Sequence, residues 1–167
     1  MIDKEIAAEG QLHTALSIWF HYGHPVAILA LAHGAYECYE ALGAHAGRPS
    51  PYKDWLGKQP QGFQDRARMM INFIKHGRKK LTGKIPFMPV LAENMLMDAI
   101  ESYKHLNGKM TPQMKLFVAR WAIENPSLGN AAIRPHIINA AKAHDIADRD
   151  RTEFLHEGFK RLSAGDS

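Results

Sequence analysis

The residues between positions 66 and 92 combine a strong positive charge with side chains that can bind and cleave phosphodiesters. This stretch contains seven Lys or Arg and no Asp or Glu, so the remainder of the chain sums to −3. A local positive field attracts phosphate or another acidic surface. On the predicted third helix, Arg68, Asn72 and His76 recur every four residues, away from the apolar stripe. Arg can neutralise a phosphate and His can move a proton near neutral pH, so these three are the candidate catalytic residues.

The remaining cations of this stretch are the predicted polyanion-binding residues. They are Lys75, Arg78, Lys79, Lys80 and Lys84, with Arg66 at the start of the segment. RNA, DNA and an acidic protein are the partners that such a surface fits. The alternative interpretation is a solvated helix face whose cations lie near the helix C-terminus, where the helix dipole favours them.

The segment around His76 also resembles a degenerate HEPN signature, in which an Arg and a small polar residue precede a His by up to about two helical turns. Asn72 and His76 match in type and spacing, whereas Ile71 occupies the position of the family's Arg and Arg68 lies one turn earlier. HEPN domains are small helical bundles, often dimeric, and many are metal-independent RNases while others are inactive. The resemblance implies a helical, dimeric binding module with little or no RNase activity.

Three segments resemble a group of bacterial all-helical proteins. They are a Gly-x-Pro-Val-Ala-Ile opening at 23–28, an Asn-Phe-x-Lys-His centre at 72–76 and an Asp-Ala-x-x-x-Tyr-x-x-Leu helix at 98–106. This second resemblance extends over residues 23–126. It implies a helical fold and no particular activity.

A second set of polar residues could hold a divalent metal. His33, Glu37 and Glu40 share one face of the predicted second helix. Four residues of a later helix could complete the site, and the last three of them share a face: Glu93, Asp98, Glu101 and His105. The functional interpretation is a metal-dependent helical-bundle enzyme. The alternative is that both glutamates pair with Lys or Arg of another helix, and that His33 is a hydrogen-bonded core residue.

Arg and His recur together near the C-terminus, in Arg149, Arg151 and His156. Arg149 and His156 share a helix face, whereas Arg151 and His156 lie about 140° apart on a helix. The alternative to a functional pair is an ordinary exposed helix face.

Length and composition limit the class of protein. The chain has 167 residues, 46% of them hydrophobic and 23% charged, which is typical of one globular domain and excludes a disordered chain. Its one cysteine, Cys38, excludes an internal disulfide framework and a Cys-rich zinc site. No secretion signal is recognised at the start, and no apolar run reaches the roughly 20 residues of a membrane span. We therefore expect a cytoplasmic protein without membrane contact.

Apolar residues recur at helical spacing, and no segment alternates with a period of two. We expect an all-α bundle of about seven helices in a single domain, 1–167. The predicted helices cover about 4–22, 25–43, 63–76, 90–106, 112–124, 135–144 and a last segment capped by Asp148 or Asp150. Apolar residues recur at helical spacing on the first helix, namely Ala8, Leu12, Ala15, Leu16 and Trp19. The last helix is expected to turn its apolar residues inward: Phe154, Leu155, Phe159 and Leu162. Residues 44–62 are expected to form a long loop with a short turn near 52–56.

Three functional hypotheses follow from these patterns. The leading one is a HEPN-like helical module, expected to form a homodimer, that binds nucleic acid or another polyanion through residues 66–84. The second is a metal-dependent enzyme that uses His33, Glu37 and Glu40. The third is a regulatory or protein-interaction dimer without chemistry.

Overall fold

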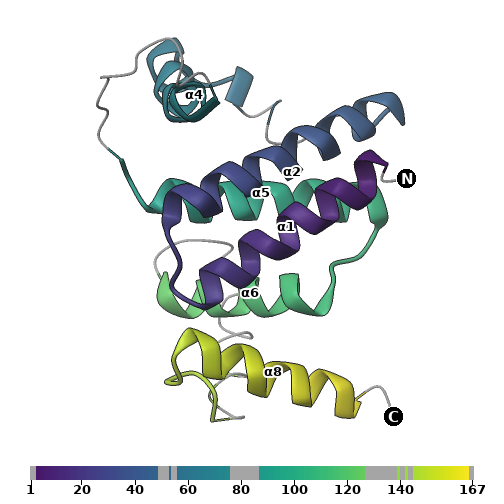
Figure 1. The fold of residues 1–167 in the computed structure, drawn as a ribbon, viewed down its shortest axis with the longest axis vertical. Helices are drawn as coiled ribbons and strands as arrows, with labels where there is room; N and C mark the ends of the chain where they lie inside the picture. The colour runs from purple at the N-terminus through teal and green to yellow at the C-terminus, as the bar shows by residue number, and fades with distance from the viewer. Residues whose placement is uncertain are drawn as a thin grey trace.

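The chain is helical in the computed structural model, which describes residues 3–48, 53, 56–75, 87–126, 139, 142 and 145–165. Six helices have defined bounds there: α1 (Lys4–Phe20), α2 (Pro25–His45), α4 (Gln61–Lys75), α5 (Val90–Asn107), α6 (Pro112–Glu124) and α8 (Arg151–Gly165) (Figure 1). The predicted all-α class is thereby confirmed. The helix expected at 135–144 lies mostly outside the described residues.

The helix ends follow local sequence signals. The Asp3 Oδ1 accepts a hydrogen bond from the Ile6 N–H at 2.9 Å, and the Asp150 Oδ1 accepts one from the Glu153 N–H at 2.9 Å. These side chains satisfy N–H groups that the first turn of a helix leaves unpaired. The α5 helix ends at Gly108, whose φ of 76° is a left-handed conformation that favours glycine.

Three helices form the centre of the molecule. The α2 helix packs most extensively on α5 and on α1, and α6 and α8 follow on one side of this group (Figure 1). The α4 helix lies at the opposite end of the longest axis from α8. The largest fully buried side chains are Trp19, Phe20, Leu29, Tyr39, Leu96, Phe117 and Phe154. Burial of each such side chain contributes about 1.5–3 kcal/mol to folding.

Two details differ from the expectations. The helix α2 extends to His45 and α4 begins at Gln61, so both ends of the expected 44–62 loop are helical, while helical Lys53 and Leu56 lie within the short turn expected near 52–56. Phe154 is 1% exposed as predicted, but Phe159 is 38% exposed, so its inward assignment was wrong. The reason is that α8 packs against α6 and α1 on one side only, so a single stripe of its residues is covered.

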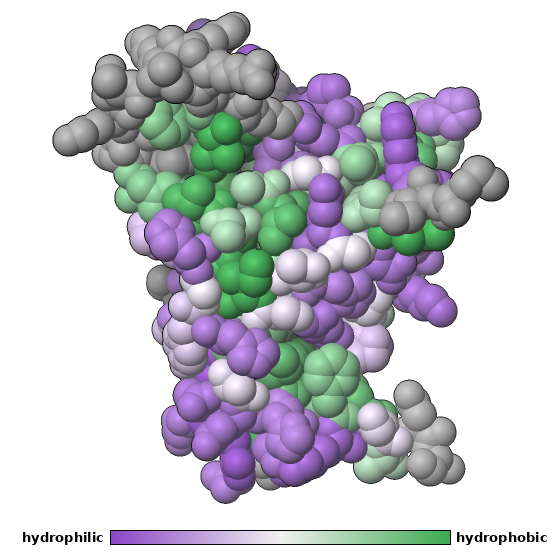
Figure 2. Space-filling model, viewed as in Figure 1, coloured by the Kyte–Doolittle hydropathy of each residue, from purple (hydrophilic) through white to green (hydrophobic). Residues whose placement is uncertain are grey.

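The surface differs between the two ends of the molecule. Hydrophobic side chains gather in the upper half of the face drawn in Figure 2, over α1 and α2, whereas hydrophilic side chains dominate over α8. Among the helices that the structure describes, none is both long and apolar enough to cross a membrane.

Candidate ligand site between α2 and α4

The α4 helix contacts α2 through a short apolar stripe. Ile71 and Ile74 are partly buried and pack against the core, whereas Arg68 and Asn72 are exposed. This arrangement follows from helical periodicity, because residues three apart share a face. The apolar stripe therefore orients α4 so that its polar residues lie at the rim of the space between the two helices.

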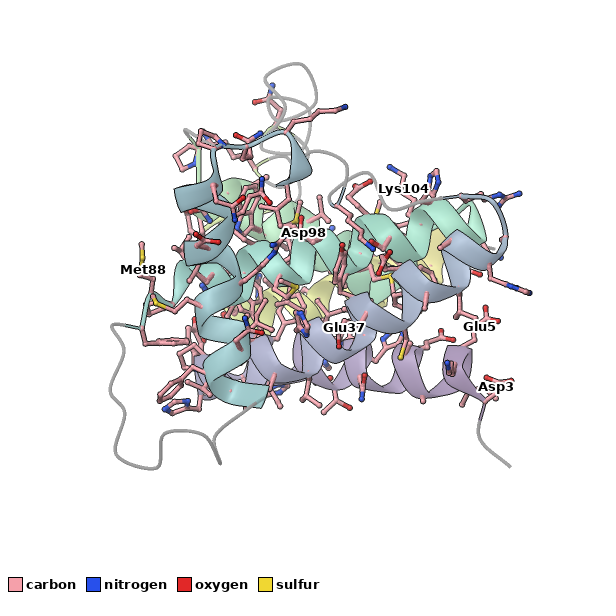
Figure 3. The ribbon with its side chains drawn as sticks, turned by 90° about the horizontal axis from the view of Figure 1, so that it is seen from above. Asp3, Glu5, Glu37, Met88, Asp98 and Lys104 are labelled. Atoms are coloured by element: carbon pink, nitrogen blue, oxygen red, sulfur yellow. The ribbon has the colours of Figure 1, made fainter. Side chains whose placement is uncertain are left out.

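A polar pocket of about 260 Å³ occupies that space. Its lining residues come from α2, α4, α5 and the segment between α2 and α4: His33, Tyr36, Glu37, Glu40, Lys53, Leu56, Arg68, Ile71, Asn72 and Met95. The pocket brings together both polar sets that the sequence singled out. Figure 3 shows the two helices from above, with Glu37 labelled on α2. The predicted metal-binding residues and two of the predicted catalytic residues thus share one site.

Most charged side chains around this pocket have a polar or oppositely charged partner. Lys53 Nζ donates to Glu40 Oε1 at 2.8 Å, and this hydrogen bond, together with the carboxylate charge, raises the pKa of Lys53. Glu37 Oε2 lies 3.7 Å from His33 Nδ1. Arg68 Nη2 donates to the neutral amide oxygen of Gln64 at 3.2 Å. Because this partner is neutral, the guanidinium keeps its charge available at the pocket rim.

The metal interpretation of this region finds no support in the geometry. In the part of the chain that the structure describes, no group of three or more His, Cys, Asp or Glu side chains could hold a metal ion. Glu40 pairs with Lys53 instead, and Glu37 is 49% exposed. The alternative that both glutamates pair with cations therefore holds for Glu40.

The α5 side chains that were expected to complete a metal site do not converge on one point either. Glu101 is exposed and its Oε2 lies 3.7 Å from Lys104 Nζ, while His105 is exposed as well. Asp98 is the exception, because burial raises the pKa of its carboxyl to about 7. It lies one turn along α5 from Met95, which lines the polar pocket.

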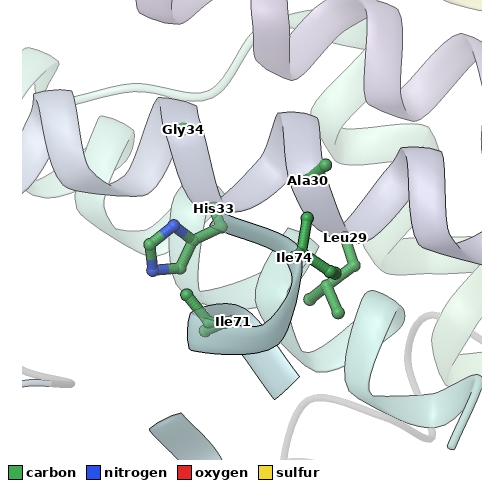
Figure 4. A pocket seen from close by; sticks show the side chains of 6 residues that line it. All are labelled: Leu29, Ala30, His33, Gly34, Ile71 and Ile74. Atoms are coloured by element: carbon green, nitrogen blue, oxygen red, sulfur yellow. The ribbon is translucent and has the colours of Figure 1, made fainter. Parts of the chain in front are cut away.

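A smaller, apolar pocket of about 140 Å³ adjoins the polar one. It is lined by Leu29, Ala30, His33, Gly34, Ile71 and Ile74 (Figure 4). His33 and Ile71 line both pockets. In Figure 4 the imidazole of His33 projects from α2 beside the Ile71 side chain. The side chain of His33 is 12% exposed, so it forms part of the wall between the two spaces.

Several residues selected from the sequence lie outside the described part of the chain. They are the candidate catalytic residue His76 and the predicted polyanion-binding residues Arg78, Lys79, Lys80 and Lys84, together with the side chains of Arg66 and Lys75. The pocket also includes residues that the sequence analysis did not select, such as Tyr36, Lys53 and Met95. Tyr36 follows His33 by three positions, so helical spacing was a usable signal for it. Lys53 carried no such signal.

A second polar cluster joins α8 to the rest of the bundle. Arg151 donates through Nε to Glu124 Oε1 at 3.0 Å and through Nη2 to Glu93 Oε1 at 3.1 Å. Its guanidinium carbon lies 3.8 Å from the ring centroid of Trp19, whose Nε1 donates to Glu93 at 3.0 Å. The predicted alternative of an exposed helix face was therefore wrong for Arg151. Of the Arg and His residues singled out near the C-terminus, His156 is the exposed one.

The arginines of this second cluster neutralise its partly buried carboxylate, Glu124. Burial acts to raise the pKa of Glu124, but hydrogen bonds from Arg151 and Arg120 outweigh that effect and hold it below its ordinary value. Arg120 also donates to the backbone oxygens of Ala147 and Arg149 at 2.9 and 2.7 Å. The network thereby fixes the segment before α8 against α6.

The α2–α4 region therefore has an exposed cation, Arg68, beside open pockets, whereas the charged groups of the Arg151 cluster pair with one another.

Comparison with protein-family models, with curated proteins and with solved structures finds no match to this chain.

Proposed function

We propose that this chain is a binding module for single-stranded nucleic acid, and that the exposed side of α4 with the basic segment 66–84 is the binding surface. The single observation that carries the proposal is the position of Arg68 and Asn72. Both are exposed on α4 at the rim of the space between α2 and α4, beside the apolar residues through which this helix rests on the bundle.

Apolar side chains stand beside these polar ones. Met69 is 44% exposed and Phe73 is 37% exposed, each next in sequence to Arg68 or Asn72. Large apolar side chains normally avoid water, so a helix that exposes two of them next to a cation suits a partner with both charge and flat apolar faces. Single-stranded nucleic acid has both, because its bases stack on aromatic rings while cations contact its phosphates.

The charge distribution supports the same partner. Residues 66–92 carry seven cations and no acid, whereas the rest of the chain is net negative. The facing wall of the polar pocket contributes Glu37 and Glu40. The basic segment therefore attracts a polyanion, whereas the carboxylates of the α2 wall do not, and this difference favours one docking orientation.

The HEPN-like motif contains one titratable side chain, His76, which directly follows α4 in the sequence. Its imidazole could move a proton to or from a phosphodiester near neutral pH. The position of the family's Arg is Ile71, so the proposal is binding with little or no cleavage. Any cleavage that accompanies binding is expected to disappear in His76→Ala while binding persists.

The experiment is fluorescence anisotropy of a labelled single-stranded RNA with the full chain at about 50 and about 200 mM salt, with the same samples run on a denaturing gel. We expect binding that weakens with salt. Arg68→Glu and the double variant Lys79→Glu/Lys80→Glu should weaken it further. They should also reduce its salt dependence, by a slope of about 0.7 for each phosphate that the protein no longer neutralises. Lys115→Glu is the matched control, because Lys115 is exposed on α6.

Two results would overturn the proposal. One is the absence of RNA binding at the lower salt concentration. The other is an equal loss of binding in Lys115→Glu and Arg68→Glu, because that result would indicate a response to net charge and not to the α4 surface.

A further inference from the structure

Two pockets, one polar and one apolar, adjoin each other between α2 and α4, and together they are called the composite pocket below. Their volumes are about 260 and about 140 Å³, and they share His33 and Ile71 in their walls. Single-stranded nucleic acid that contacts the exposed residues of α4 would not occupy the apolar part. A ligand that occupies both parts needs a polar end and an apolar end.

The apolar part sets the size of one end of the ligand. It is lined by aliphatic side chains of α2 and α4, with the His33 ring at its boundary (Figure 4). An apolar cavity of about 150 Å³ in a protein is large enough to bind benzene. A phosphate or a sugar would lose its hydration there without gaining hydrogen bonds. This part therefore fits an aromatic ring or a short alkyl group.

The polar part sets the charge of the other end. Arg68 offers a guanidinium that donates to the neutral Gln64 amide, and Asn72 lies one turn further along the same helix. Guanidinium groups bind carboxylates through paired, charge-assisted hydrogen bonds. The opposite wall carries Glu37 and Glu40, the latter already paired with Lys53. A singly charged carboxylate balances the one guanidinium of Arg68, whereas a phosphate monoester brings a second negative charge.

We propose that the composite pocket binds a small monocarboxylate that bears an aromatic ring or a short alkyl group. The carboxylate contacts Arg68 and Asn72, and the apolar group occupies the space between Leu29 and Ile74. This site overlaps the proposed nucleic-acid surface, because Arg68 and Asn72 also line the polar pocket. The two sites share Arg68, so a carboxylate bound there competes with nucleic acid for that side chain.

The test measures binding of phenylacetate and of hexanoate to the full chain by calorimetry or ligand-observed NMR. Phenylacetamide is the neutral counterpart and acetate lacks the apolar group. We expect the two probes to bind about ten-fold or more tightly than either control, because one charge-assisted contact or one buried ring supplies at least that factor. Arg68→Met should reduce probe binding by a similar factor while keeping the aliphatic stem.

Ala30→Leu tests the apolar part without disturbing the core. Ala30 lines the apolar pocket and is exposed, so a leucine there can fill the space. Ala41→Leu is the matched control, because Ala41 is exposed on the same helix and does not line either pocket. We expect Ala30→Leu to abolish probe binding and to leave RNA binding intact, and Ala41→Leu to leave both intact.

Each opposite result overturns the proposal of a carboxylate site. Absence of binding of both probes does so, and so does equal binding of phenylacetamide, because it removes the role of Arg68. Probe binding that survives Ala30→Leu places the ligand elsewhere. Loss of RNA binding with probe binding retained overturns only the nucleic-acid proposal, so the two failures are distinguishable.

Discussion

The two ends of this molecule use their arginines in opposite ways. At the α8 end, Arg151 is 18% exposed, pairs with two carboxylates and stacks on Trp19. At the α4 end, Arg68 is exposed and donates to a neutral amide. At the α8 end, these polar groups are paired with other side chains of the same chain. The α4 end leaves a cation, an amide and an adjoining apolar space for a ligand.

Packing explains the difference. The helix α8 contacts both α6 and α1, and α6 approaches it so closely that a Cβ at Gly158 would meet the side chain of Leu116. The helix α4 has its main described contact with α2 alone. A helix that packs against two others buries the charges beside the contact and must pair them, whereas a helix that rests mainly on one neighbour keeps its charges in water. Between these two helices, a buried ion pair therefore indicates a structural role, and an exposed cation beside a pocket indicates a binding role.

The largest expected effect comes from breaking the anchor of α8. Arg151→Met removes the cation that pairs with Glu93, while Glu124 keeps its ion pair with Arg120. The change should therefore lower the free energy of unfolding by about 3 kcal/mol, at the lower end of the range for a buried pair. Chemical denaturation measures it. Lys160→Met, on the exposed side of α8, is the control and should change stability by less than about 0.5 kcal/mol. Similar losses in both variants would contradict the role given to the Arg151 cluster.

The second prediction sharpens the comparison with a carboxyl that is buried without such a cation. Burial raises the pKa of Asp98 from 3.8 to about 7, whereas paired Glu124 has a lowered pKa. The folded state therefore keeps a proton that the unfolded state releases above pH 3.8. Asp98 consequently lowers stability as pH rises from about 4 to about 7, by up to about 4 kcal/mol, with no further change above that range.

Asp98→Asn should remove this dependence. The variant is expected to match the wild type near pH 4 and to exceed it at pH 8, as measured by urea denaturation at both values. Glu101→Gln, an exposed carboxyl of the same helix, serves as the control and should follow the wild type. A variant that is less stable than the wild type at pH 8 would contradict the assignment.

The third prediction concerns the attachment of α4. Ile71→Ala removes part of the apolar stripe that rests on α2, and should cost about 1–2 kcal/mol, because the side chain is only partly buried. The loss should be local. Amide hydrogen exchange is expected to speed up in α4 and to stay unchanged in α5. Equal acceleration in both helices would mean that α4 unfolds together with the bundle.

The smallest effect is expected at Arg68 itself. Arg68→Met should change the free energy of unfolding by less than about 0.5 kcal/mol, because an exposed arginine with a neutral partner contributes little to folding. The same variant should weaken binding of RNA and of the carboxylate probes. Measured together, thermal denaturation and binding separate a ligand contact from a structural one. A large loss of stability would place Arg68 in the same class as Arg151.

Much of the fold could be predicted from the sequence because its signals are local. The caps at Asp3 and Asp150 and the stop at Gly108 depend on residues within one helical turn. The inward residues of α1 followed from helical periodicity in the same way. The predicted inward position of Phe159 was wrong. Which side of α8 is covered depends on the helices that pack against it, and periodicity within α8 does not show this.

The site was harder to predict because it depends on distant segments. Each polar set was visible by its spacing, His33 with Glu37 on one helix and Arg68 with Asn72 on another. Spacing says which residues share a face of one helix, and says nothing about which face meets which. Lys53 was missed for this reason, although it neutralises Glu40 and so removes that carboxylate from the proposed metal set.

The sequence by itself determined the helical class, most helix boundaries, the core of α1 and the concentration of positive charge in residues 66–84. All of these follow from periodicity, capping and charge along a short stretch of chain. Only the tertiary structure decided that α4 lies against α2, that His33 stands between a polar and an apolar pocket, and that Arg151 is an anchor while Arg68 faces solvent at the pocket rim. The physical reason is that burial and pairing depend on neighbours far away in sequence, and a charge acquires its role only when the chain around it has packed.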